Sequence, residues 1–299
     1  MVATLKDVAR LAGVSVKSVS NVVNGYPYVS DELRGVLALV VPGCEMPRFA
    51  ELAREVVGNA ARRGYRVVIE HAARSARCDV RPVLVDGVLL AADVAGHELT
   101  DPTPLVLLGE APAGRCDRVA IDHARAAEDA TAHLLHTGRR RIAAIGDRPP
   151  ASPAPPQRRT VGYRRALRRA GLAPPPGYLQ PARLDRRGEG YRAARTLLAY
   201  EQRPDALLCY SDALAIGALR AVADAGLRVP QDVAVIGIGD SEEGGFARPS
   251  LSTVSADTAF IAREAVARLT TRIARRDVAP TTVVAPHRVV PRESTRPAG

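Results

Sequence analysis

From residue 36 onwards, short apolar runs alternate with longer amphipathic segments, and several amphipathic segments stop at a glycine. Short apolar runs are typical of buried strands, whereas amphipathic segments closed by glycine are typical of helices. Regular alternation of the two predicts βαβ units, in which neighbouring strands run parallel and helices cover the sheet. The expected fold class of this region is therefore an open α/β fold with parallel sheets.

The individual elements can be placed along the chain from these patterns. The expected strands are 36–41, 67–70, 88–90, 105–108, 142–145, 206–210 and 233–238. The expected helices are 49–63, 124–136, 160–170, 190–198, 213–225 and 258–273. Gly64, Gly138, Gly171 and Gly226 are positioned to end four of these helices. The proline-rich stretch 149–156 is expected to be a loop between two lobes.

Residues 4–25 follow a different pattern, that of two short helices joined by a tight turn. Thr4 and Ser15 are positioned as helix caps, and Gly13 supplies the turn between the helices. A helix-turn-helix of this kind places its second helix in the DNA major groove. An ordinary helical hairpin that supports a larger fold is the alternative interpretation of the pattern alone.

The same run resembles the DNA-binding head of the lactose-repressor-type (LacI/GalR) transcription regulators. The resemblance lies in Thr-Leu-Lys-Asp-Val-Ala at 4–9, Ala-Gly-Val-Ser at 12–15, Val-Ser-Asn-Val-Val-Asn-Gly at 19–25 and Val-Ser-Asp at 29–31. Later stretches, such as Ser-Asp-Ala-Leu-Ala-Ile-Gly at 211–217, resemble the core of the same family. That core is built like periplasmic sugar-binding proteins.

The resemblance implies a small all-α helix-turn-helix head at 1–35, followed by a two-lobe α/β core with parallel sheets at 36–299. Lobe 1 is expected to comprise about 36–145 plus 253–279, and lobe 2 about 146–252 plus 280–293. The implied function is that of a cytoplasmic, homodimeric, sequence-specific transcription repressor. A small sugar-like effector between the lobes would control its affinity for a pseudo-palindromic operator in double-stranded DNA.

The second helix of the head carries the candidate base-reading side chains. Lys17 can donate to guanine, Asn21 can pair with adenine, and Val16 can pack on a thymine methyl group. The family also reads sequence at these three positions, but it often has Arg where this chain has Asn21. The residues expected to contact DNA are Thr4, Lys6, Ser15, Val16, Lys17, Ser18, Ser20, Asn21 and Asn24. Hydrogen bonding at a helix end is the alternative for Ser20 and Asn24.

The expected effector site is carried over from the family residue by residue. Arg159 matches an effector-contacting arginine, with a surface arginine as the alternative interpretation. Ser211 stands where the family usually has Asn, and Gly239 where it usually has an acidic residue, so this chain departs from the usual sugar site. The full expected set is Arg48, Phe49, Asp122, Arg159, Ser211, Asp212 and Asp240.

One segment of the family pattern is missing. Family members carry a third head helix and a hinge helix before the first core strand, whereas here Ser30–Gly35 leads directly into that strand. A helix after Ser30 would have only about one turn, too short to be stable without packing. The crossover between 67–70 and 85–90 is also shortened. The alternative function is therefore a ligand-binding or interaction module that has lost specific DNA binding together with its hinge.

Composition adds little to this reading. The net charge of +10 is weak evidence for DNA binding, because residues 1–35 contribute only +1 and only two of the 42 basic residues are lysine. No apolar run suggests a signal peptide or membrane span. The four cysteines, together with His133 and His136, do not form a convincing metal pattern. The sequence shows no nucleophile elbow or phosphate loop, so neither an enzymatic reaction nor a cofactor is expected.

Overall fold

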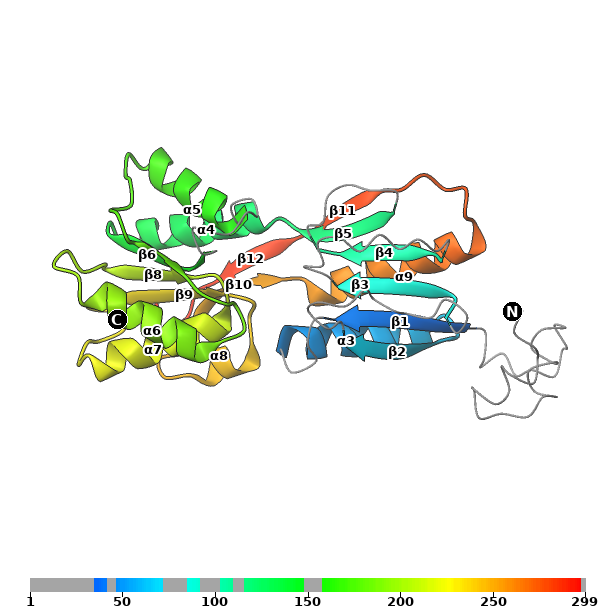
Figure 1. Ribbon diagram of the computed structural model, residues 1–299, viewed down its shortest axis with the longest axis horizontal. Coiled ribbons are helices and arrows are strands. Elements are labelled where there is room, and N and C mark those ends of the chain that lie inside the picture. Colours follow the sequence, from blue (N-terminus) through cyan, green and yellow to red (C-terminus); the bar gives the residue numbers. More distant parts are fainter. Residues whose placement is uncertain are drawn as a thin grey trace, which may run out of the picture.

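The computed structural model describes residues 35–41, 47–71, 85–91, 103–109, 116–147 and 158–296. These residues form two α/β lobes that lie end to end along the longest axis of the molecule (Figure 1). The helix-turn-helix expected in the head, and all nine residues expected to contact DNA, lie outside the described residues.

Lobe 1 is built on a six-stranded sheet with the order β11-β5-β4-β3-β1-β2, in which every neighbouring pair is parallel. Helices α3 and α9 pack against this sheet, and Leu37, Leu89 and Val266 lie in the core between them. The elements of lobe 1 are β1 (Gly35–Val41), α3 (Pro47–Ala61), β2 (Tyr65–His71), β3 (Gly87–Ala91), β4 (Leu105–Leu108), β5 (Asp117–Ile121), α9 (Thr258–Ala274) and β11 (Thr282–Ala285).

Lobe 2 is built on a second six-stranded sheet with the order β12-β10-β9-β8-β6-β7, and only the β10–β12 pair is antiparallel. Its strands are β6 (Ile142–Asp147), β7 (Leu179–Pro181), β8 (Ala206–Cys209), β9 (Ala234–Ile238), β10 (Ser252–Ala256) and β12 (His287–Val290). Its helices are α4 (His123–His136), α5 (Arg158–Arg169), α6 (Arg187–Leu198), α7 (Asp212–Asp224) and α8 (Glu242–Phe246).

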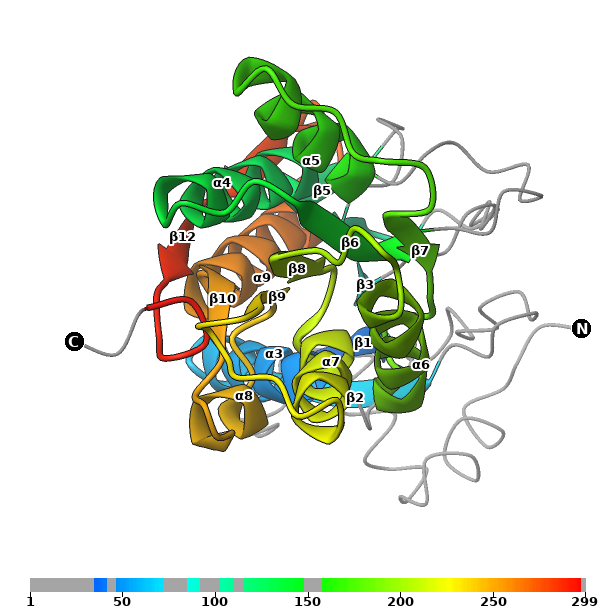
Figure 2. The same cartoon turned by 90° about the vertical axis from the view of Figure 1, so that its left-hand side faces the viewer.

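Both faces of the lobe 2 sheet are covered by helices, as the continuous apolar runs of its central strands require. Successive side chains of a strand point to opposite faces. Ile142 therefore packs into the core beside α4 and α5, whereas the next residue, Ala143, packs into the core beside α6 and α7. Figure 2 shows these two helix pairs on opposite sides of the strands.

The chain passes between the lobes three times, from β5 to α4, from β10 to α9 and from β11 to β12. Asp122 and Asp257 cap the helices that follow the first two crossings, and their Oδ1 atoms accept the amide hydrogens of Arg125 at 2.9 Å and Phe260 at 2.8 Å. The Asp257 amide also donates to the carbonyl of Pro286 at 3.1 Å. The second and third crossings are thereby joined by a backbone hydrogen bond.

The expected division of the chain between the lobes is wrong for four elements. Both α4 and β6 belong to lobe 2, although the sequence reading placed them in lobe 1. The strands β10 and β11 are likewise exchanged between lobes. An apolar pattern predicts that a strand exists, but the hydrogen-bond partner that decides its sheet is remote in sequence. The first crossing between the lobes follows β5. The proline-rich stretch 149–156, which is expected to be a loop between the lobes, lies outside the described residues.

The strands and helices expected from residue 36 onwards are all present, with ends shifted by up to three residues. Gly64, Gly138, Gly171 and Gly226 have positive φ values of 78°, 90°, 71° and 69°, which confirms them as helix-ending residues. The elements that the pattern did not predict are β5, β7, β10, α8, β11 and β12. Each has five residues or fewer, and a run this short gives weak periodicity.

Glycine allows two helices of lobe 2 to approach each other at backbone distance. A Cβ atom on Gly217 of α7 would lie 2.0 Å from the carbonyl oxygen of Arg187, and one on Gly190 of α6 would lie 2.2 Å from that of Leu214. The two glycines therefore permit the contact between α6 and α7 from both sides.

We predict that Gly217→Ala lowers the free energy of unfolding by about 1–3 kcal/mol, because the added methyl group forces the two backbones apart. Gly188→Ala in α6 is the matched control, since its Cβ would meet only the end of the Arg192 side chain at 3.7 Å. At a helix position with space, alanine stabilises by up to about 1 kcal/mol. Urea unfolding of both variants checks this, and equal midpoints would contradict the predicted steric contact.

Candidate functional site: the cleft between the lobes

A cleft of about 940 Å³ is bordered by both lobes. Lobe 1 contributes Ala50, Glu51 and Arg54, which lie in α3. Lobe 2 contributes residues from three segments, 183–192, 211–216 and 238–243. The last two segments begin at or just beyond the carboxyl ends of β8 and β9. This edge of an open parallel sheet is where ligands usually bind, because helices begin there and polar loops converge.

Asp212, one of the expected effector residues, lines the cleft but is only 4% exposed. Its Oδ2 atom accepts the amide hydrogen of Ser241 at 2.6 Å, and its Oδ1 atom accepts the hydroxyl hydrogen of Thr253 at 2.7 Å. Burial raises the pKa of the Asp212 carboxyl, and these hydrogen bonds oppose that rise only in part. Asp212 therefore ties α7 to the loop after β9 and to β10, and both of its oxygens already have partners.

Asp240 lines the same wall of the cleft, with a φ of 56° that is uncommon outside glycine. Its Oδ1 atom lies 2.6 Å from Nη2 of Arg292, and its amide donates to Oγ1 of Thr253 at 3.2 Å. Arg292 also donates to the carbonyl of Leu251 at 2.8 Å. The sequence reading did not assign Arg292 to the site, because only the fold brings the C-terminal segment beside β9.

Ser211 and Asp122 both act as helix caps in the structure. The Ser211 hydroxyl accepts the amide hydrogen of Leu214 at 3.3 Å and donates to the carbonyl of Leu184 at 2.5 Å. Ser211 lines the cleft, whereas Asp122 caps α4 and is not among the lining residues. A cap at a helix start satisfies backbone amides that would otherwise lack partners.

Arg159 and Phe49 are not among the described residues that line this cleft. Arg159 is 8% exposed, and its Nη2 atom lies 3.0 Å from Nδ1 of His123, the residue that follows Asp122. Since a guanidinium can only donate, Nδ1 accepts in this contact. Phe49 is 9% exposed and packs in the core of lobe 1, and it is not among the described residues that line this cleft. Arg48 belongs to α3, but its side chain lies outside the described part.

The segment 183–192 forms a charged wall of the cleft that the sequence reading missed. Nε of Arg183 lies 2.6 Å from Oε1 of Glu189, and Nη2 of Arg187 lies 3.2 Å from Oε1 of Glu243 in α8. Among the described residues, five arginines and seven acidic residues line the cleft, and none of these lining residues is aromatic. A site of this kind recognises its ligand through hydrogen bonds and charge.

Other kinds of site were sought in the described ranges. They contain no group of three or more His, Cys, Asp or Glu side chains that could hold a metal ion. Within the same ranges, none of the helices combines the length and apolar character needed to cross a membrane. His133 is one of the two histidines considered as metal ligands, and its Nε2 atom lies 2.8 Å from Oγ1 of Thr295.

Comparison with known proteins assigns both parts of the chain. Residues 4–42 match the family described as bacterial regulatory proteins, lacI family, and residues 131–295 match the periplasmic binding protein-like domain. The ribose operon repressor of Escherichia coli is 32% identical over 291 residues, covering 84% of this chain and 87% of that protein. The repressor CytR of Escherichia coli is 32% identical over 304 residues, covering 88% of each protein.

Two solved structures share the architecture over most of the chain. A LacI-type transcription regulator from Bifidobacterium animalis subsp. lactis has a TM-score of 0.80 at 30% identity, covering 87% of this chain and 99% of that chain. A complex of the transcriptional regulator CelR with cellobiose has a TM-score of 0.75 at 30% identity, covering 98% of this chain and 100% of that chain. A helix-turn-helix head and a two-lobe core thus occur in one chain, and this chain belongs to the lacI family of bacterial regulatory proteins.

Proposed function

We propose that this protein is a transcription repressor whose affinity for operator DNA is set by a small molecule bound between its lobes. The observation that carries the proposal is the union, in one chain, of a lacI-type head at 4–42 and a core with a cleft bordered by both lobes. We place the protein in the cytoplasm with the chromosome and assign it no enzymatic reaction.

The core offers a physical route from ligand to DNA. A ligand that contacts α3 on one side and the segments of lobe 2 on the other favours one relative orientation of the lobes. The chain enters lobe 1 at Gly35, and the next residue, Val36, is held by its neighbours. Its amide donates to Oδ2 of Asp86 at 2.7 Å, and its carbonyl accepts from the Asp86 amide at 2.8 Å. A movement of lobe 1 would therefore be transmitted to the chain that leads to the head.

The effector in this proposal is a hydroxyl-rich small molecule of the sugar class. The polar lining of the cleft supports it, as does the cellobiose complex of the related regulator CelR. The ribose operon repressor is a further relative named for a sugar operon. The absence of an aromatic side chain among the described lining residues favours recognition by hydrogen bonds over stacking.

A second candidate function is a ligand-binding or interaction module without specific DNA binding. The match to the lacI head extends to residue 42, yet residues 35–41 form the first strand of lobe 1. These residues are therefore not available for the helices that complete the head. The alignment with the ribose operon repressor is 291 positions long but covers only 84% of this 299-residue chain. Part of the relative therefore lies opposite gaps in this chain.

Lys17→Ala tests the DNA-binding function. We expect it to cost about 1–3 kcal/mol in affinity for a pseudo-palindromic duplex selected from a randomised pool, and to relax specificity at one base pair. Arg195→Ala removes a charge of the same sign from the exposed surface of α6 and serves as the control. Fluorescence anisotropy measures both. If the selection at low salt enriches no sequence, the second candidate function replaces the first.

Ile216→Trp tests the effector cleft, because Ile216 of α7 lines it and the bulky indole ring of tryptophan would occupy space that a ligand needs. We expect one member of a panel of pentoses, hexoses and disaccharides to raise the melting temperature of the wild-type protein. A ligand at one hundred times its dissociation constant stabilises the folded state by about 2.7 kcal/mol. Val161→Trp on the exposed face of α5 should retain the shift, whereas Ile216→Trp should lose it. A panel without any shift would contradict the sugar class and leave the DNA test unaffected.

We also propose that the protein is a homodimer, joined along the side of the molecule that carries β2, α3 and α8. These elements lie along one edge of both lobes in Figure 1. Val68 and Ile69 of the edge strand β2 are 46% and 43% exposed, Val57 of α3 is 43% exposed, and Phe246 of α8 is 83% exposed. Apolar side chains on one edge suit an isologous contact, and a pseudo-palindromic operator requires two-fold symmetry.

Phe246→Asp combined with Ile69→Asp tests the dimer. We expect sedimentation velocity to show a dimer for the wild-type protein and a monomer for this variant, because a charge in an apolar interface lacks compensation. Val161→Asp is the control that should remain dimeric, because Val161 of α5 is an apolar residue with an exposed fraction of 42%, close to the 43% of Ile69. A monomeric wild-type protein, or a dimeric double variant, would contradict the proposed interface.

A further inference from the structure

Helix α5 carries a concentration of positive charge that the proposed effector cleft and the head do not explain. Its sequence, Arg-Arg-Thr-Val-Gly-Tyr-Arg-Arg-Ala-Leu-Arg-Arg, contains six arginines and no acidic residue in 12 positions. The whole chain has a net charge of +10, so this one helix carries charge equal to more than half of that excess.

The packing of α5 fixes which of its side chains meet solvent. Tyr163 and Leu167 are buried in the core beside α4, and the Tyr163 hydroxyl donates to the carbonyl of Ile142 at 2.7 Å. A Cβ atom on Gly162 would lie 1.9 Å from the carbonyl oxygen of Ala124, so α5 touches the backbone of α4 there. This contact prevents rotation of the helix. All its arginines except Arg159 are exposed.

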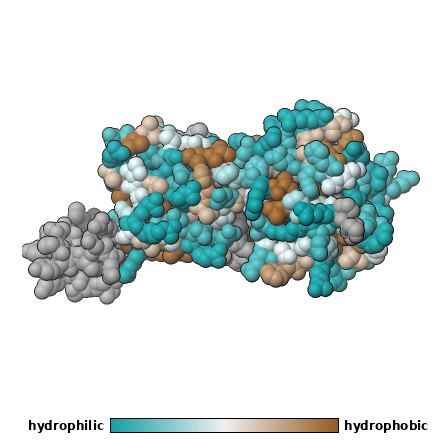
Figure 3. All heavy atoms as spheres, turned by 180° about the vertical axis from the view of Figure 1, so that it is seen from behind, coloured by the Kyte–Doolittle hydropathy of each residue, from teal (hydrophilic) through white to brown (hydrophobic). Residues whose placement is uncertain are grey.

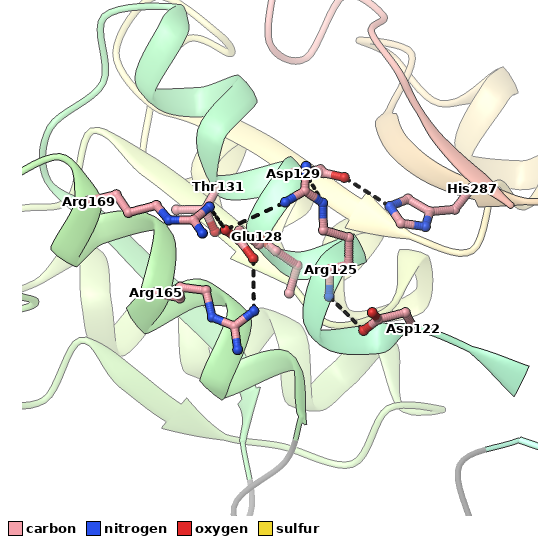
Figure 4. A network of polar contacts seen from close by, with 9 residues as sticks. Asp122, Arg125, Glu128, Asp129, Thr131, Arg165, Arg169 and His287 are labelled. Atoms are coloured by element: carbon pink, nitrogen blue, oxygen red, sulfur yellow. Dashed lines mark hydrogen bonds and ion pairs between the residues drawn. The ribbon is translucent and has the colours of Figure 1, made fainter. Parts of the chain in front are cut away.

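The acidic side chains under α5 are already engaged. The buried carboxylate of Glu128 in α4 pairs with Arg169 and, at 3.3 Å, with Arg165 (Figure 4). Its neighbour Asp129 pairs with Arg125 at 3.1 Å and lies 3.0 Å from Nε2 of His287. Glu128 therefore supplies one negative charge against the two arginines on the side of α5 that faces α4.

Arg164 and Arg168 are exposed and form no ion pair with an acidic residue in the described part of the chain. They are four positions apart in the helix, so they stand one above the other about 6 Å apart along it. In the view from behind, hydrophilic side chains stand at the top of lobe 2 next to smaller apolar areas (Figure 3). The outer side of α5 thus carries two exposed guanidinium groups, about one helical turn apart, whose donors have no acidic partner in the described part of the chain.

We propose that α5 binds the phosphate backbone of double-stranded DNA without sequence preference, on a segment separate from the operator. Guanidinium groups bind phosphate oxygens in bidentate fashion, and a row of them releases the counterions of the duplex. The helix lies in lobe 2, whereas the chain from the head enters lobe 1 at Gly35, towards the opposite end of the long axis (Figure 1). The protein can then hold its operator through the head and a second DNA segment through α5.

The test compares Arg164→Gln/Arg168→Gln with the control Arg195→Gln/Arg220→Gln in the full chain. The control removes the same charge from the exposed surfaces of α6 and α7, on the opposite face of the sheet. Binding to a random duplex without an operator is measured by anisotropy across a salt series. We expect the slope of log K against log salt to become shallower by about 1.8 for the α5 variant, as for two lost phosphate contacts, and to stay unchanged for the control.

Equal slopes for the two variants would overturn the proposal. Poly-glutamate provides a second arm. If the α5 variant lost binding to this acidic polypeptide while its duplex slope stayed unchanged, α5 would be a protein-docking surface and the DNA proposal would fail. Lys17→Ala, which acts on operator specificity, is expected to leave the slope difference between the α5 variant and its control intact. Failure here is therefore distinguishable from failure of the repressor function.

Discussion

The three crossings between the lobes are the constraint on which the rest of this structure depends. Each lobe has its own sheet, which is parallel throughout in lobe 1 and antiparallel only at β10–β12 in lobe 2. The connections at Asp122, Asp257 and Pro286 must therefore carry any change from one lobe to the other. Two of them are also the points where a helix starts, and an aspartate cap defines the backbone there. The cleft lies between two lobes that each have their own sheet and core.

The polar side chains of the cleft form two groups: those that hold its wall together and those that are exposed on its surface. Asp212 and Asp240 hold the loop after β9 against β10 and the C-terminal segment, and Arg292 neutralises Asp240. In a low-dielectric site such pairing is what makes a buried carboxylate tolerable. The charged side chains of 183–192, by contrast, are largely exposed and accessible to a ligand.

The arginines of this protein have different partners in different parts of the structure. In the cleft each arginine of the pairs Arg183–Glu189 and Arg187–Glu243 has an acidic partner, so the field there is mixed. On α5 the acidic partner lies beneath the helix, and the outer arginines remain available. The same residue type therefore serves as a structural tie in one place and as an anion-binding surface in another.

The sequence by itself determined the types of the longer core elements, the glycines that end four helices, and the family, through the run at 4–25 and the stretches of the core. These signals are local, because periodicity, capping and turn residues act within a few positions. Only the tertiary structure decided that α4 and β6 belong to lobe 2, that Phe49 is a core residue, and that Arg292 meets Asp240. Strand pairing and ion pairing join residues far apart in the chain, and nothing in a local pattern records which remote partner the packing will supply.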